Sequence, residues 1–141
     1  MINVKERMLQ AFEKAKVSAS IKKSVQGEFD LISRYLHEIT GGNLEFGYKE
    51  GSRLNYQTET FVYIKHVLAS NLDNAIFLFG FTIDDIAGYP VLIEDDDNIY
   101  TIENAESLKE DIVLRITNQS VMLKILDLVD KVKDIESSIP F

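Results

Sequence analysis

The chain has 141 residues, of which 45% are hydrophobic and 27% are charged, and its formal net charge at pH 7 is −8. This length is typical of one domain that buries its own core without metals or cross-links, so we expect a single domain over residues 1–141. The chain contains no cysteine. Its absence excludes disulfides, thiolate nucleophiles and cysteine-based zinc or iron–sulfur sites.

Two features of the sequence indicate where the protein resides. The N-terminal segment MINVKERMLQAFEKAK has no continuous apolar region, so it is not a signal peptide. The longest apolar run, residues 75–81, has the length of a strand and is far shorter than the roughly 20 residues of a membrane span. We therefore expect a cytoplasmic protein without membrane partners.

The charge is unevenly distributed along the chain. Residues 1–67 contain ten basic and eight acidic residues, a net charge of +2, whereas residues 68–141 contain five and fifteen, a net charge of −10. Within residues 84–111 there are ten acids and one base. Such a field repels phosphate backbones and attracts cations. We expect a basic protein partner, and no direct nucleic-acid binding through the acidic half.

The first forty residues show helical periodicity. Four apolar residues at helical spacing predict a first helix over residues 3–16: Val4, Met8, Phe12 and Ala15. Four more predict a second helix over residues 27–40, ended by a pair of glycines: Phe29, Ile32, Leu36 and Ile39. Residues 16–25 fit two structures. Val17, Ala19 and Ile21 alternate with polar residues, as in a short strand, but nothing in the segment forbids a continuing helix.

The pattern then changes to that of β-structure. Aromatic and β-branched residues predict about five strands, at residues 44–48, 53–66, 75–83, 89–93 and 99–102. The connections between them are short, which favours an antiparallel meander because parallel pairs need a long crossover.

Two helices are predicted after the strands. Asn104 is a good N-cap for a helix over residues 105–117, and Ser120 is a candidate cap for a last helix. The last helix has an apolar seam, which would suggest a homodimer if it were exposed: Val121, Ile125, Leu128, Val132 and Ile135. The fold class is α+β, with two N-terminal helices, an antiparallel meander of about five strands, and two C-terminal helices packed on one face of the sheet.

No catalytic motif is present in the sequence. Neither His37 nor His66 belongs to a recognisable catalytic pattern, so we predict no catalytic residues, no cofactor and no enzymatic activity. The acidic run does not match an EF-hand calcium loop, because Tyr100 occupies the sixth position from Asp95, where a glycine is needed. We predict no specific metal site, and a weak divalent-cation site stays an alternative.

Six acidic residues in two predicted turns are the candidate partner-binding residues: Asp84, Asp85, Glu94, Asp95, Asp96 and Asp97. The turns flank one predicted strand and should lie roughly 20 Å apart, forming two acidic corners instead of one site. Acidic turns also discourage edge-to-edge aggregation, which is the alternative explanation.

The leading hypothesis is a non-enzymatic acidic interaction protein (an adaptor, inhibitor or immunity-type protein) that docks a basic surface of a macromolecular partner. The alternative hypothesis is a small-molecule or metabolite-binding domain with a pocket between the sheet and the helices.

Overall fold

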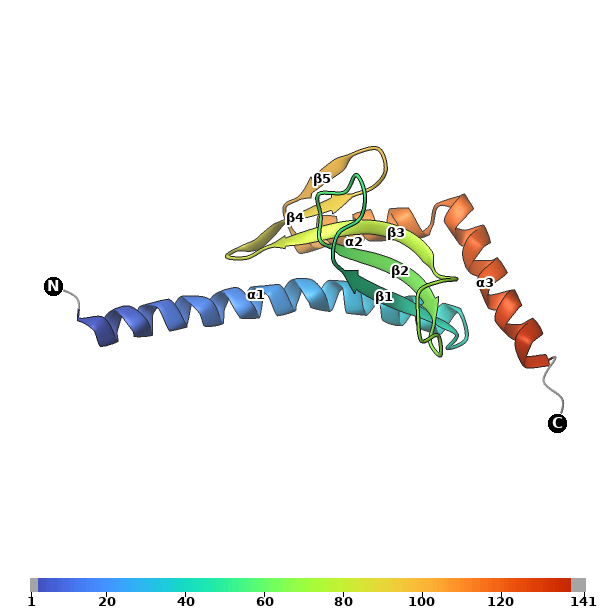
Figure 1. Ribbon diagram of the computed structural model, residues 1–141, viewed down its shortest axis with the longest axis horizontal. Helices are drawn as coiled ribbons and strands as arrows, with labels where there is room; N and C mark the ends of the chain where they lie inside the picture. The colour runs from blue at the N-terminus through green and yellow to red at the C-terminus, as the bar shows by residue number, and fades with distance from the viewer. Residues whose placement is uncertain (1–2, 138–141) are drawn as a thin grey trace.

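The computed structural model describes residues 3–137, with side chains described as far as Lys131. It has an α+β architecture, in which a five-stranded antiparallel sheet is combined with three helices (Figure 1). The elements in chain order are α1 (Val4–Ile39), β1 (Leu44–Glu50), β2 (Thr60–His66), β3 (Ile76–Asp84), β4 (Gly88–Glu94), β5 (Ile99–Ile102), α2 (Ala105–Ile116) and α3 (Gln119–Ser137).

The sheet is the predicted meander. Its strands lie in the order β1-β2-β3-β4-β5, and every neighbouring pair is antiparallel. The predicted second strand began too early, because residues 53–59 belong to a loop and β2 begins at Thr60. This loop lies over the aromatic face of the sheet, so its tyrosine and threonine side chains are placed by tertiary contacts and not by strand pairing.

The two predicted N-terminal helices are one continuous helix, α1, so the predicted helix count was wrong. Residues 16–25 contain no proline or glycine, and Ile21 and Val25 extend the apolar stripe of the second predicted helix at a spacing of four. The strand-like alternation in this segment therefore has no structural counterpart. At 1.5 Å per residue the 36 residues of α1 extend over about 54 Å.

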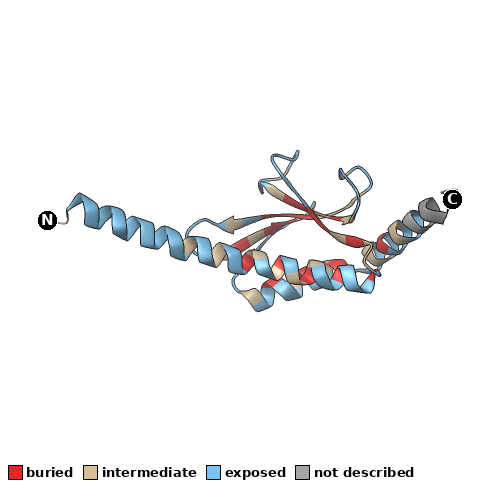
Figure 2. Cartoon of the chain, turned by 90° about the horizontal axis from the view of Figure 1, so that it is seen from below, coloured by how far each residue is buried: buried red, intermediate tan, exposed pale blue. Residues whose placement is uncertain are grey.

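The core lies between one face of the sheet and the helices α1 and α2 (Figure 2). From α1 the buried residues are Val25, Phe29, Ile32 and Leu36, and from α2 they are Leu108, Ile112 and Ile116. They meet strand residues that include Ile64, Phe79 and Val91. Only the C-terminal half of α1 takes part, because its residues 4–17 are all exposed.

The predicted packing of both C-terminal helices on the same face was wrong. The helix α2 lies beside α1 under the sheet, whereas α3 begins at one end of the sheet and runs away from it (Figure 1). The face is already covered by the long α1, so α3 packs at the end beside β2 and α2.

The seam of α3 is only partly free. Ile125 is buried, and Val121 and Leu128 are half-buried against the core. Val132 and Ile135 lie outside the residues whose side chains are described. The helix is capped by Asn118 and not by the predicted Ser120, because the Asn118 side-chain oxygen accepts a hydrogen bond from the Ser120 backbone N–H (2.9 Å).

The turn between β3 and β4 touches the middle of α1. Gly88 has a φ of +76°, and a Cβ at this position would collide with the side chain of Ile21. The Ser18 hydroxyl donates to the carbonyl oxygen of Ile86 in the same turn (2.9 Å). N-terminal to this contact α1 leaves the body of the molecule. None of the described helices is long and apolar enough to cross a membrane.

Candidate partner-binding groove

Glu94, one of the predicted contact residues, is buried and serves the fold. Only 5% of its surface is exposed. Its carboxylate oxygen Oε1 accepts three hydrogen bonds: from the backbone N–H of Gln57 (2.8 Å), the backbone N–H of Thr58 (3.0 Å) and the Thr58 hydroxyl (3.1 Å). Glu94 therefore fastens the loop of residues 51–59 to the sheet, and its carboxylate is not available as a first contact for a partner.

Asp84 and Asp95 each shape the turn that they begin. The Asp84 carboxylate accepts from the backbone N–H groups of Ile86 (3.0 Å) and Ala87 (2.8 Å). In the same way Asp95 accepts from the N–H groups of Asp97 (2.9 Å) and Asn98 (2.8 Å). Aspartate is favoured at such positions because its short side chain can satisfy the backbone two and three residues further on. These two acids are required locally whether or not a partner binds.

The two acidic turns lie at opposite ends of β4, as the sequence predicts. In the first turn Asp85 pairs with Lys22 of α1 (2.6 Å). This leaves Asp96 and Asp97, both exposed in the second turn, as the predicted residues that best fit a contact role.

Asp96 and Asp97 border an open groove of about 720 Å³. The groove lies where the β4–β5 turn meets β3, the end of α2 and the start of α3. Its apolar lining residues are Phe77, Leu78, Leu114 and Val121. Its charged lining residues are Asp95, Asp96, Asp97, Asp111 and Arg115, a net charge of −3. The groove is thus lined by both apolar and acidic side chains.

Arg115 organises the wall of this groove. Its Nε donates to Asp111 (2.7 Å), one helical turn earlier on α2, and its Nη1 donates to Asp95 (3.1 Å). Its guanidinium lies 5.0 Å from the ring centroid of Tyr100. Burial raises the pKa of Asp95, but the backbone N–H groups of Asn98 and Asp97 and the nearby Arg115 outweigh it, so the pKa lies below its usual value. Arg115 offsets one of the two charges of Asp95 and Asp111, so these three residues together keep a charge of −1, and Asp96 and Asp97 contribute the other −2.

Tyr56 links Asp96 to the loop of residues 51–59. Its hydroxyl donates to the Asp96 carboxylate (2.6 Å), and its ring packs edge-on against Phe61 and Phe77. Burial, followed by the bond to Asp96, raises the pKa of Tyr56, so the hydroxyl stays protonated and continues to donate. Arg53 stacks on Phe77, with its guanidinium carbon 3.9 Å from the ring centroid. The loop thereby holds one side of the groove in place.

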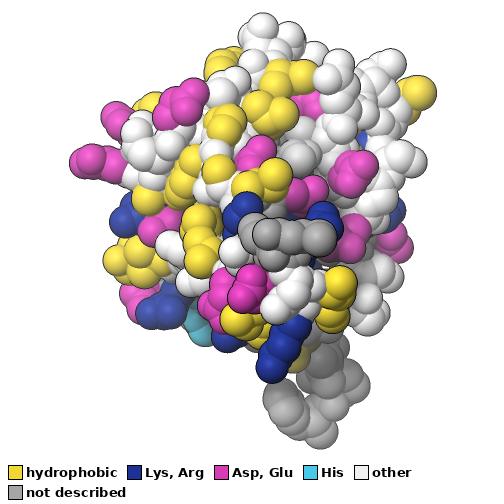
Figure 3. Space-filling view, turned by 90° about the vertical axis from the view of Figure 1, so that its left-hand side faces the viewer, with side chains coloured by type: hydrophobic (Ala, Val, Ile, Leu, Met, Phe, Trp, Pro, Cys, Tyr) yellow, Lys and Arg dark blue, Asp and Glu magenta, His cyan; other side chains and the backbone are white. Residues whose placement is uncertain are grey.

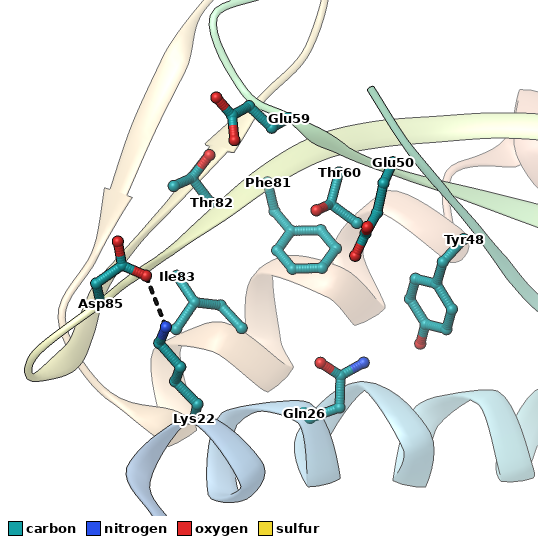
Figure 4. A pocket seen from close by; sticks show the side chains of 10 residues that line it. All are labelled: Lys22, Gln26, Tyr48, Glu50, Glu59, Thr60, Phe81, Thr82, Ile83 and Asp85. Carbon is teal, nitrogen blue, oxygen red and sulfur yellow. Dashed lines mark hydrogen bonds and ion pairs between the residues drawn. The ribbon is translucent and has the colours of Figure 1, made fainter. Parts of the chain in front are cut away.

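A second groove, of about 460 Å³, lies between α1 and the sheet (Figure 4). Its polar lining residues include Lys22 and Gln26 of α1, Glu50 and Thr60 of neighbouring strands, and Asp85. Tyr48 and Phe81 supply aromatic surface. Burial and the negative charge of Asp30 raise the pKa of the Tyr48 hydroxyl.

The histidines lie apart from both grooves. His66 is the last residue of β2 and pairs with Leu44 of β1. Its Nδ1 accepts a hydrogen bond from the backbone N–H of Leu68 (3.1 Å) in the turn that follows the strand. His37 is exposed on α1. Among the described residues, no three histidine, aspartate or glutamate side chains are grouped as the ligands of a metal ion.

Sequence reasoning missed the groove itself. Arg115, Leu114 and Tyr100 line it, and none of them was a candidate site residue. The spacing of Asp111 and Arg115 by four residues on a predicted helix indicates an ion pair and could have identified Arg115. The approach of the β4–β5 turn to α2 depends on the tertiary fold and has no local signal in the sequence.

Comparison with known proteins adds no relative: no family model, no curated protein and no solved structure matches this chain.

Proposed function

We propose that this protein is a non-enzymatic, cytoplasmic interaction protein, of the adaptor, inhibitor or immunity type, whose acidic groove binds a basic segment of a protein partner. The observation that supports the proposal is the presence of apolar side chains and the exposed carboxylates of Asp96 and Asp97 in the lining of one groove. Apolar lining residues favour burial of hydrophobic side chains, and acidic lining residues select partners that carry lysine or arginine beside them.

The charge of the whole chain supports the same partner chemistry. With a net charge of −8, the protein attracts a basic partner over a distance of about one Debye length, roughly 10 Å at 0.1 M salt. Such steering acts mainly on the association rate, whereas the apolar contacts in the groove determine how long the complex lasts.

The test uses a fluorescent helical peptide in which lysines flank an apolar stripe, with a second peptide in which every lysine is glutamate. We expect the basic peptide alone to bind, as measured by fluorescence anisotropy. The groove variant Asp97→Lys/Leu114→Lys should slow association of the basic peptide about tenfold or more, because it removes one acid and adds two bases at exposed positions.

The matched control is Asp85→Lys/Ile86→Lys, which makes the same chemical changes in the acidic turn at the other end of β4. Both double variants move the net charge from −8 to −5. If the control slows association as much as the groove variant, general charge and not the groove determines binding. Equal binding of the basic and acidic peptides would contradict the proposal outright.

The second groove favours a second candidate function, the binding of a small polar molecule between α1 and the sheet. Its wall offers an ammonium group, an amide and several carboxylates within one concave surface (Figure 4). A thermal-shift screen against polar metabolites tests this function, since a ligand that binds the native state raises the unfolding temperature by mass action. A hit should lose its effect in Gln26→Leu, and a hit that keeps its full effect there does not bind in this groove.

A further inference from the structure

The first part of α1 projects from the molecule as a bare helix. We refer to residues 4–17 as the arm. Every residue of the arm is exposed, and the first contacts of α1 with the body are made by Ser18 and Lys22 (Figure 2). An isolated helix of about 14 residues is marginally stable in water. The arm is helical because it continues a helix whose other half is packed on the core. Its exposed apolar side chains could be buried by contact with a partner.

The arm is amphipathic in a specific way. At 100° per residue, its apolar stripe consists of Val4, Met8, Ala11, Phe12 and Ala15. Bases border the stripe on both sides, with Lys5 and Lys16 on one side and Arg7 and Lys14 on the other. The two acids, Glu6 and Glu13, lie on the opposite face, and Leu9 and Val17 fall outside the stripe.

The charge of the arm is opposite to that of the rest of the chain. The arm has four bases and two acids, a net charge of +2, so the remaining residues together carry −10. Viewed from the end at which the arm projects, the molecule shows basic and hydrophobic side chains among acidic ones (Figure 3). The arm therefore has the chemistry proposed above for the ligand of the groove, in which an apolar stripe is bordered by bases.

The arm cannot occupy the groove of its own chain. It projects from one end of the molecule, whereas the groove lies beside the start of α3 toward the other end (Figure 1). The helix α1 is continuous between the arm and the core, so the arm has no hinge about which to fold back.

We propose that the arm of one chain docks in the acidic groove of a second copy, so that the protein self-associates head to tail. This inference rests on the proposed function, because it uses the same groove. Pairing of two arms is disfavoured, since the bases that border both stripes would face each other and like charges at such flanking positions oppose association.

The experiment is sedimentation velocity of the full chain over a range of concentrations. We expect the weight-average sedimentation coefficient to rise with concentration and the association to weaken about tenfold or more in 0.5 M salt. The arm variant Met8→Glu/Phe12→Glu should lose this association, and so should the groove variant Asp97→Lys/Leu114→Lys. Met8 is 67% exposed and Phe12 is 59% exposed, so the arm variant should keep the fold of the original chain. Circular dichroism of both variants checks that they are folded.

A mixture of the two variants distinguishes head-to-tail docking from pairing of arms. The arm variant keeps an intact groove and the groove variant keeps an intact arm, so the mixture should form a heterodimer although neither variant associates alone. The matched control Leu54→Glu/Leu68→Glu, which changes residues of 87% and 81% exposure outside the arm, should associate like the original chain.

Three outcomes would overturn the inference. A chain that sediments as a monomer at every concentration has no such contact, and the proposed function survives if the basic peptide still binds the groove. Failure of the mixture to associate, while the original chain does, means a different interface. Binding of the monomeric chain to phosphatidylserine vesicles but not to phosphatidylcholine vesicles, lost in the arm variant, would assign the arm to an anionic membrane surface instead.

Discussion

At the scale of single residues, neighbouring acids in one sequence run have different roles. Glu94 is buried under a loop, Asp95 folds the turn and holds Arg115, and Asp97 is exposed at the groove. The sequence shows four adjacent carboxylates without distinguishing them. Glu94 lies on the sheet face opposite α1, where an alternating pattern predicts solvent exposure. Its burial depends on residues 57 and 58, which are far away in the sequence.

The role of Glu94 leads to a prediction about stability. Glu94→Ala leaves the N–H groups of Gln57 and Thr58 without their acceptor and should lower the free energy of unfolding by about 2–4 kcal/mol. Glu94→Gln retains a carbonyl oxygen that can accept and should recover part of this loss. Urea denaturation measures both. Asp97→Ala is the exposed control, and a loss in Glu94→Ala no larger than in this control would show that the carboxylate does not hold the loop.

The depressed pKa of Asp95 makes stability depend on pH. Its carboxylate has a lower pKa in the folded state than the unfolded reference of about 3.9, so it stabilises the fold above that pH and loses this contribution as the pH falls through the folded value. Asp95→Asn should therefore lose less stability than the original chain between about pH 5 and pH 3. Chemical denaturation at a series of pH values measures the difference, and parallel curves would contradict the expectation.

At the scale of elements, α1 is one helix with two parts, an exposed arm and a half that packs on the core, and the sequence pattern predicts these parts as two separate helices. The periodicity before residue 16 and after residue 27 is predicted correctly, because each half has its own apolar stripe. The two stripes face different directions around the helix axis, which is why they resemble separate helices in sequence. Four of the five strands are predicted within two residues at each end, because their aromatic and β-branched pattern is local, whereas the start of β2 was wrong because residues 53–59 are placed by tertiary contacts. The position of α3 could not be predicted, since it depends on α1 covering the face of the sheet, which no local pattern in the sequence shows.

Gly27 offers a test of the continuous helix. It lies in the interior of α1, and a Cβ there would meet no other atom within 4 Å. Gly27→Ala should therefore raise the free energy of unfolding by about 0.5–1 kcal/mol, because alanine loses less backbone entropy on folding. Thermal unfolding followed by circular dichroism measures the change. A helix interrupted at residue 27 would instead be destabilised or unaffected by the substitution.

At the scale of the whole molecule, the structure separates a packed body from an arm that makes no contribution to the core. Trypsin should therefore cleave after Lys5, Arg7, Lys14 and Lys16 well before it cleaves after the half-buried Lys65 and Arg115. Mass spectrometry of a digestion time course measures the order. Self-association through the arm should slow the first cleavages at high protein concentration. Simultaneous cleavage in the arm and the body would contradict the prediction, because it would mean that the body is as accessible to trypsin as the arm.

The continuity of α1 also makes the molecule a spacer of fixed length. The arm extends about 21 Å beyond the body, and no proline or glycine between residues 4 and 26 allows it to bend. In a head-to-tail assembly the distance between successive bodies is then determined by the number of residues in one helix. Inserting or deleting a single helical turn would change that repeat by about 5.4 Å, a difference that electron microscopy of the assembly can resolve.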